Sequence, residues 1–391
     1  MKLVKLSDIS NKITKGTTPQ KEAFQGKEVN YIKSESLNYN GHIDINYFCS
    51  IDMATHKSKL KRSILKENDI LISIAGANLG KIGIVSKDML PANTNQAVGI
   101  ISLKPNLVKS RYVYYYMQQT RIRNIINNSV AQSAQPNLNL TQLGNIKIEI
   151  PQLNIQDKII KILDIISKKI DLNIRTNNNL YEIGRAIYQE YFENEKYTSS
   201  YETKQLSEVT TNNRNKIDKN KECKVLSAVN TGKLVLSDDY FDKQVYSKDI
   251  GKYLNVNKND FAYNPARINI GSIGLNTYDF NCCVSPVYVT FSVDKDYIDF
   301  FDFYFKSKRF NAEVTLRASG SVRQALSYND FGMIEILYPS KEMINKFNKS
   351  YSKIKNRINK NKMKINNLEQ IRDTLLPKLM NGEIDIDKIE I

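Results

Sequence analysis

The stretch "NDILISIAGANLGKIGI" (Asn68–Ile84) occurs a second time, in altered form, later in the chain. The second version, "NDFAYNPARINIGSIGL" (Asn259–Leu275), aligns with the first without a gap. Both begin with Asn-Asp, and both carry the pattern Asn-x-Gly-x-Ile-Gly near their ends. The match predicts an internal repeat, in which one structural unit is used twice.

Two further matches extend the repeat over most of the chain. The opening "VKLSDIS" (Val4–Ser10) is echoed by "KQLSEVT" (Lys204–Thr210). Ser133–Phe192 aligns with Ser321–Met380 at a constant offset of 188 residues (133 against 321). Each copy opens with short β-rich runs, and the first also has a helical stretch near residues 111–127, so we predict a mixed α/β globule in each copy.

A long helix is predicted to follow each globule. After Pro151 the apolar residues follow alternating steps of three and four, the spacing of a helix that buries one stripe, and the second copy repeats this pattern. Each run covers roughly 40 residues, or about 60 Å at 1.5 Å per residue. So long a stripe needs a partner, which the other copy supplies. The predicted coiled-coil seam consists of Leu163, Ile166, Ile170, Asn173 and Leu180 in the first helix and Ile354, Ile358, Asn361, Ile365 and Leu368 in the second.

We predict that these helices pair as an antiparallel coiled coil with pseudo-twofold symmetry. One linker, near Asn194–Glu202, then turns the chain back. Asn173 and Asn361 are interpreted as polar residues that set the register, although tolerated asparagines in an Asn-rich chain explain them equally well. The fold class is therefore mixed α/β (α+β). The predicted divisions are a globule at 1–152, a long helix with linker at 153–197, a globule at 198–340, and a long helix with tail at 341–391.

Composition points to a polyanionic partner. The chain has 57 Lys and Arg against 41 Asp and Glu, a net charge of +16, although an AT-rich genome would also enrich lysine. No apolar run approaches the ~18 residues of a membrane span, and the first residues do not form a signal peptide, so we expect a soluble cytoplasmic protein. The four cysteines form no CxxC pair, which favours reduced thiols and no metal site.

The glycine turn resembles a phosphate-binding loop but lacks its spacing. A Walker loop needs four residues between its first glycine and the Gly-Lys pair, followed by Ser or Thr. In Gly76–Lys81 three residues intervene, and Ile82 follows. The second copy has Arg267 and Ser272 in place of the first glycine and the lysine. We therefore predict a tight turn between two strands, whose glycines allow positive φ or close approach of another backbone.

No other catalytic motif assembles. "YNPAR" (Tyr263–Arg267) is similar to the Asn-Pro-Pro-aromatic motif of amino-group methyltransferases, but Ala266 replaces the second proline. No HExxH or GxSxG motif occurs, and two histidines give little general-base capacity. We therefore predict no catalytic residue and no cofactor in this chain, with the loose acid and lysine pattern of a nuclease left as an alternative.

The residues predicted to contact DNA are polar side chains in loops near the glycine turns. Asn, Gln and Arg make bidentate contacts with adenine or guanine, whereas Ser and Lys suit phosphates. The alternative for each is an ordinary exposed loop residue. The predicted set is Asn78, Lys81, Asn95, Gln96, Gln132, Ser133 and Gln135 in the first copy and Arg267, Asn269, Ser272, Arg317, Ser319, Ser321, Arg323 and Gln324 in the second.

Taken together, the repeat and its motifs resemble the specificity subunit of Type I restriction-modification systems. The resemblance covers essentially the whole length. The motifs that carry it are "ILKENDILISIAGANLGKIGIV" (Ile64–Val85), "SAQPNLNLTQLGNIKIEIPQLNIQDKI" (Ser133–Ile159), "YNPARINIGSIG" with "VSPVYVTF" (Val284–Phe291), and "LLPKLMNGE" (Leu375–Glu383).

The resemblance implies a division of labour along the chain. Target recognition domains at 1–152 and 198–340 would each read one half of a bipartite DNA sequence, and the two helices would fix the unread spacer. The subunit would be non-catalytic and would dock two methylase subunits, which bind S-adenosylmethionine and methylate adenine. Restriction subunits that use ATP would join the full complex. One departure is Ile344 at the place of Gln156, which puts an equivalent partner contact in doubt.

Two functions from other classes remain as alternatives at this point. One is a single-chain DNA-modifying enzyme, either a nuclease or a methyltransferase, and the other is a protein-interaction adaptor built on the coiled coil. The enzyme would need a catalytic domain for which the two copies leave no room.

Overall fold

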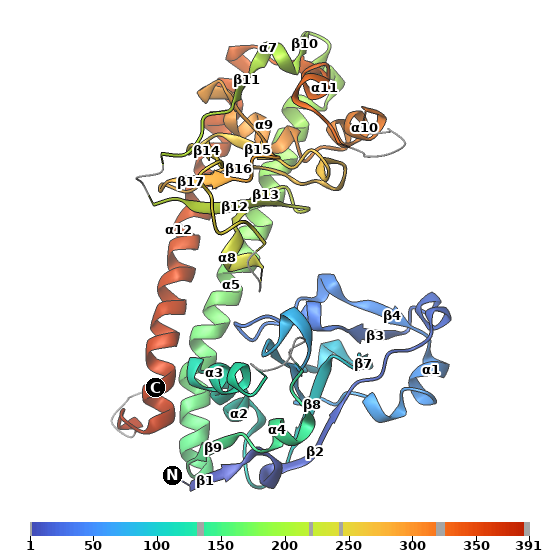
Figure 1. Cartoon of the computed structure of the whole chain (residues 1–391), viewed down its shortest axis with the longest axis vertical. Coiled ribbons are helices and arrows are strands. Elements are labelled where there is room, and N and C mark those ends of the chain that lie inside the picture. Colours follow the sequence, from blue (N-terminus) through green and yellow to red (C-terminus); the bar gives the residue numbers. More distant parts are fainter. Residues whose placement is uncertain (1, 131–136, 219–221, 242–244, 318–324, 387–391) are drawn as a thin grey trace. The chain divides into compact units, whose positions relative to one another are not determined.

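The structure, a computed structural model shown in Figure 1, describes residues 2–130, 137–218, 222–241, 245–317 and 325–386. The fold divides into two units, Met1–Ile174 with Met363–Ile391, and Arg175–Lys362. Both divisions fall inside a long helix, either α5 (Leu153–Phe192) or α12 (Lys341–Asn381). Each unit therefore contains one globule and one part of each long helix.

The globule of the first unit has two main sheets and a strand pair that joins its two ends. One sheet is antiparallel, in the order β2-β8-β5-β6, and the other has the order β4-β3-β7, in which β3 and β7 run parallel. The strands are β1 (Lys2–Lys5), β2 (Ser10–Lys15), β3 (Val29–Ile32), β4 (Cys49–Ile51), β5 (Ile70–Ser73), β6 (Ile82–Ile84), β7 (Ala92–Thr94), β8 (Val98–Leu103) and β9 (Lys147–Ile150). The helices are α1 (Met53–Lys57), α2 (Ser110–Met117), α3 (Thr120–Asn128) and α4 (Leu140–Gly144).

The globule of the second unit repeats this topology, with a fourth strand in its second sheet. Its sheets have the orders β11-β18-β15-β16 and β13-β12-β17-β14, again with one parallel pair, β12 and β17. The strands are β10 (Glu202–Gln205), β11 (Thr210–Asn213), β12 (Lys224–Val229), β13 (Lys233–Leu236), β14 (Leu254–Val256), β15 (Phe261–Tyr263), β16 (Ile273–Leu275), β17 (Cys282–Val284), β18 (Val289–Val293) and β19 (Glu335–Tyr338). The helices are α6 (Glu195–Thr198), α7 (Leu206–Val209), α8 (Ser237–Tyr240), α9 (Ile298–Tyr304), α10 (Lys308–Arg317) and α11 (Tyr328–Gly332). The predicted repeat is thus a repeat of structure.

The turn that precedes β5 in the first unit and β15 in the second is formed by residues that match in the repeat. Asn68 and Asn259 have positive φ angles of 68° and 73°, a conformation that asparagine adopts more readily than most residues. The buried carboxylates that follow them hold the same turn closed. Asp69 accepts from the Lys66 amide at 2.8 Å, and Asp260 accepts from the Asn257 amide at 3.0 Å. The shared Asn-Asp pairs are therefore structural.

The long helices pack against each other in opposite directions within each unit. In the first unit, Ile159 and Leu163 near the start of α5 share an apolar core with Leu379 near the end of α12. In the second unit, Tyr188 near the end of α5 shares a core with Phe347 near the start of α12. The predicted antiparallel pairing of two long helices is confirmed.

The ten predicted seam residues are all buried or half-buried, although the two seam asparagines differ in their contacts. In the second unit, Asn361 donates across the helix pair to Asn177 Oδ1 at 3.1 Å. In the first unit, Asn173 donates to the Lys169 carbonyl of its own helix at 2.9 Å. Asn361 thus makes the interhelical bond that a register-setting residue needs, whereas Asn173 satisfies itself within α5.

Each globule is fastened to the helix that follows it by an ion pair, with opposite polarity in the two units. In the first, Arg111 of α2 contacts Asp164 of α5 at 2.6 Å. In the second, Asp299 of α9 contacts Lys355 of α12 at 2.5 Å. Arg111 and Asp299 occupy the same place at the repeat offset of 188 (111 against 299). The globule therefore supplies the cation in one unit and the anion in the other.

Candidate nucleic-acid interface

The glycine turn of the first unit links β5 to β6 through a short helical turn, Gly76–Asn78. Gly76 and Gly80 have positive φ angles of 71° and 81°, which only glycine adopts without strain. The Ser73 amide donates to the Lys81 carbonyl at 2.7 Å, and the Gly80 amide donates to the Ser73 carbonyl at 2.8 Å. These bonds close a tight strand-turn-strand element, as the sequence predicts, with no phosphate-loop geometry.

Two predicted DNA-binding residues lie together on this turn. Lys81 Nζ donates to Asn78 Oδ1 at 2.7 Å and lies 5.5 Å from the centre of the Tyr39 ring. The Arg123 guanidinium lies 5.0 Å from the same ring centre. All four side chains are partly exposed. The result is a cationic and aromatic surface that suits a phosphate beside a base. The sequence does not predict Tyr39 and Arg123 as part of it, because no sequence periodicity connects them to the turn.

The glycine turn of the second unit has the same backbone hydrogen bond. Asn264 donates from its amide to the Ser272 carbonyl at 3.0 Å, which matches the Ser73 to Lys81 bond at the offset of 191 (73 against 264). Gly271 has a φ of 87° and packs so closely on the Asn230 carbonyl that a Cβ would lie 2.8 Å from its oxygen. Arg267 is exposed, Asn269 is half-buried, and Ser272 is buried with 2% exposure.

The remaining predicted DNA-binding residues are dispersed. Asn95 is half-buried in the β7 to β8 connection, where its Oδ1 lacks a hydrogen-bond partner among the described residues, and the neighbouring Gln96 is exposed. Arg317, at the end of α10, is held by Glu313 and by the Met333 carbonyl at 3.2 Å. Seven further predicted residues lie outside the described residues, and these are Gln132, Ser133, Gln135, Ser319, Ser321, Arg323 and Gln324.

The buried acids near the turns are poor candidates for catalysis. Burial raises the pKa of Asp69, although hydrogen bonds from Ser102 and the Lys66 backbone oppose the shift. Burial likewise raises the pKa of Asp260, opposed by bonds from Asn257. Both carboxyl groups are occupied in holding turns, and the described residues contain no group of three or more His, Cys, Asp or Glu side chains placed to bind a metal.

None of the described helices is long and apolar enough to span a membrane.

The motif glutamine at the start of α5 is also structural. Gln156 is fully buried, accepts from the Lys109 amide at 2.9 Å and donates to the Pro151 carbonyl at 2.9 Å. It thereby fixes the start of α2 against the start of α5. Ile344, its counterpart, is also fully buried. Neither side chain is therefore accessible at the surface of its unit.

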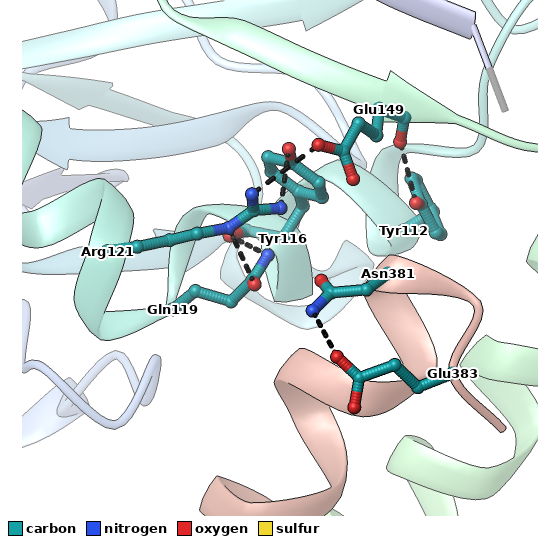
Figure 2. A network of polar contacts seen from close by, with 7 residues as sticks. All are labelled: Tyr112, Tyr116, Gln119, Arg121, Glu149, Asn381 and Glu383. Carbon is teal, nitrogen blue, oxygen red and sulfur yellow. Dashed lines mark hydrogen bonds and ion pairs between the residues drawn. The ribbon is translucent and has the colours of Figure 1, made fainter.

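A network of polar contacts surrounds Arg121 at the start of α3 (Figure 2). Its guanidinium donates to Tyr116 OH at 2.8 Å and to Gln119 Oε1 at 3.0 Å, and it pairs with Glu149 at 3.5 Å. Tyr112 donates to the Glu149 carbonyl at 2.7 Å. These bonds fix the turn between α2 and α3 against β9.

Comparisons with known proteins identify relatives of one kind. Residues 1–182 match the family described as "Type I restriction modification DNA specificity domain". The EcoBI specificity subunit of Escherichia coli is 28% identical over 147 residues, which are 36% of this chain and 30% of that protein. The HindI specificity subunit of Haemophilus influenzae is 41% identical over 69 residues, 18% of this chain and 15% of that protein. The matched stretches thus span less than a third of either relative.

The fold also has a solved counterpart. The crystal structure of a Type I restriction-modification system S subunit from M. genitalium aligns with a TM-score of 0.51 at 16% identity. The alignment covers 97% of this chain and 96% of that one. At 16% identity this similarity shows the fold alone.

Proposed function

We propose that this chain is the non-catalytic, DNA-reading specificity subunit of a Type I restriction-modification system, because residues 1–182 match the family described as "Type I restriction modification DNA specificity domain". The observation that carries the proposal is the strand-turn-strand element, which has the same strand register, the same closing hydrogen bond and different side chains in the two units. A bipartite target, with one half-site for each globule, suits a scaffold of this kind.

In this proposal the partners supply the chemistry. The chain docks two methylase subunits in the cytoplasm, and these bind S-adenosylmethionine and methylate adenine in each half-site. Restriction subunits that use ATP join the same assembly. The paired helices set the length of the unread spacer, since a change of one helical turn moves a residue by about 5.4 Å along a helix axis.

The turns supply the candidate contacts for reading. In the first unit, Lys81 is suited to a phosphate and Asn78 to a base edge, with the bond between them holding the amide in place before DNA arrives. In the second unit, Arg267 and Asn269 are the accessible side chains. Ser272 is buried, so we leave it out of the proposed contacts.

Footprinting with the methylase partner on a library of random duplexes tests the proposal. We expect a protected site in two parts with a fixed gap. We also expect affinity to fall steeply with salt, because phosphate contacts release counterions. A lack of sequence preference at every salt concentration would refute DNA reading. Methylation or cleavage by the chain without a partner would favour a single-chain enzyme instead.

Exchange of residues 1–152 for the corresponding segment of a relative tests whether the globules read independently. We expect one half-site to change and the other to stay the same. A change in both half-sites would contradict separate reading. Removal of whole helical turns from α5 and α12 together should instead alter the gap, with both half-sites kept.

A further inference from the structure

The first unit has a cavity of about 250 Å³, and only Tyr39 and Arg123 of its lining also belong to the surface beside the glycine turn. It lies where the turn between α2 and α3 faces the last turns of α12, and Figure 2 shows Gln119 and Arg121 of the turn in one view with Asn381 of α12. Three cations, Arg121, Arg123 and Arg372, and one carboxylate, Asp373, line it.

The second unit has a cavity of about 400 Å³ at the equivalent place. Its lining comes from the turn between α9 and α10 and from the last turns of α5. The offset of 188 relates Gln119 and Thr120 of the first cavity to Ser307 and Lys308 of the second (119 against 307). The repeat has therefore produced the same cavity twice, each time between a globule and the end of a long helix.

The two cavities have the same charge balance from different positions. Arg185, Lys306 and Lys308 line the second cavity together with one carboxylate, Glu193. At the offset of 188, Lys308 of the second cavity corresponds to Thr120 of the first. Arg372 of the first cavity corresponds to Gly184 of α5, the helix that lines the second cavity. Arg121, Arg372, Arg185 and Lys306 each already pair with a carboxylate. Among the described residues, Arg123 in the first cavity and Lys308 in the second have no such partner, and these two cations favour an anionic occupant.

Buried donors without partners point to the same ligand chemistry. Gln118 lines the first cavity at 7% exposure, and its Nε2 has no hydrogen-bond partner among the described residues. Tyr304 lines a cavity that adjoins the second one through Ser307 and Lys308, and its buried hydroxyl also lacks a partner within the described part of the chain. The first amides of α3 and α10, which open at these cavities, add further donors and a positive dipole end. An acceptor anion suits donors of this kind.

The shape of the cavities favours a protein side chain over a DNA phosphate. Arg372 is only 7% exposed, so its charge lies at the bottom of a recess. Tyr39 and Leu376 contribute apolar wall in the first cavity, as Tyr188 and Phe303 do in the second. A flexible acidic side chain reaches into such a recess, whereas the phosphates of a duplex are fixed on a broad ridge.

We propose that these two cavities are docking sites for a carboxylate-bearing segment of a partner protein that binds in two copies. The inference rests on the proposed function, in which that partner is the methylase subunit. Each methylase copy inserts the same acidic segment, one into the first cavity and one into the second. The duplicated chain thus binds two identical partners through two sites of its own.

A matched pair of substitutions tests this docking. Thr120→Glu and Lys308→Glu place a carboxylate at the first residue of α3 and of α10, where both native side chains are exposed. An acid at the first helical position favours the helix, so both variants keep their fold. Lys252→Glu, on the exposed surface of the second globule, is the charge control, and Thr120→Lys is the control that adds a cation.

The readout is native mass spectrometry of the chain with the methylase subunit, alongside duplex binding by the chain itself. We expect two methylase copies on the wild type, one on each single glutamate variant and none on the double variant. Each lost site should weaken at least tenfold, while both controls keep two copies and all variants keep duplex binding.

The outcomes that overturn the inference are distinct. Two methylase copies on the double variant would show that the cavities do not dock the partner. Loss of duplex binding with two copies retained would assign the cavities to DNA phosphates. A wild type that binds no methylase at all would instead refute the proposed function, and the docking inference with it.

Discussion

The ion pair between Arg111 and Asp164 gives a stability prediction that can be worked out from the structure. Asp164 Oδ1 accepts from Arg111 Nη2 at 2.6 Å, from Arg111 Nε at 2.8 Å and from Tyr115 OH at 2.7 Å. The Asp164 side chain is 18% exposed and that of Arg111 is 38% exposed. This pair is the less exposed of two charged links between the start of α2 and the start of α5, the other being Lys109 with Asp157, so its loss should loosen the first globule from its helix.

The expected magnitude follows from these contacts. A hydrogen bond to a charged group contributes about 1.5–3 kcal/mol when it is well buried. The guanidinium is more than one-third exposed and is therefore partly screened by solvent, which places the coupling near the lower end, at about 1.5 kcal/mol. The highly exposed pair between Lys346 and Glu342, at 57% and 79% exposure, serves as the control and should give only about 0.3 kcal/mol.

A double-mutant cycle measures this coupling. The variants are Arg111→Met, Asp164→Asn and the double variant, with Lys346→Met, Glu342→Gln and their double as the control cycle. The chain has no tryptophan, so urea unfolding is best followed by circular dichroism at 222 nm. A coupling as small as that of the control pair would refute the view that this link holds the globule on its helix.

The remaining predictions concern glycine packing, pH and DNA contact. Gly274→Ala should destabilise the fold by about 3 kcal/mol, because a Cβ on Gly274 would lie 2.5 Å from the Leu234 backbone. Its repeat counterpart Gly83→Ala should cost less, because a Cβ there would lie 2.3 Å from the Ile43 side chain, which can move. Equal urea midpoints for the two variants would contradict this. Burial raises the pKa of Asp69 above its usual 3.8, so the folded state binds the Asp69 proton more tightly than the unfolded chain does. The free energy of unfolding should therefore fall as pH rises through that raised pKa. Unfolding titrations of Asp69→Asn from acid to neutral pH should lack this contribution to the slope. Lys81→Ala should weaken binding to all duplexes alike and reduce the slope of log affinity against log salt by about 1, and a loss confined to one base sequence would show that Lys81 reads a base.

Some features of the site were predictable because the two copies can be compared within one chain. Asn68 and Asn259, and the acids that follow them, are identical because both hold the same left-handed turn, and this constraint is local. Lys81 and Ser272 differ because no backbone requirement fixes them. The comparison does not predict that Ser272 is buried, since its burial depends on residues packed around the turn from elsewhere in the second globule.

Other features depend on contacts that no sequence spacing records. Tyr39 lies beneath Lys81 and Arg123 only because the fold brings three separate segments of the first globule to one surface. The paired cavities are a similar case, since each forms between a globule and the end of a helix from the other copy. Gln156 lies in a motif where a partner contact is conceivable, yet both its amide oxygen and its amide nitrogen are hydrogen-bonded to the backbone.

The sequence by itself determined the repeat, the mixed α/β class and the antiparallel helix pair, because turn glycines and a three-and-four apolar spacing act over a few residues or one helix. The tertiary structure alone decided which polar side chains remain accessible, as with the exposed Arg267 and the buried Ser272 on one turn. It alone also placed Gln118 and Arg372, more than 250 residues apart in sequence, around one cationic cavity. The burial and the electrostatic environment of a side chain at such a place depend on residues that are distant in sequence. Only the folded chain brings those residues together.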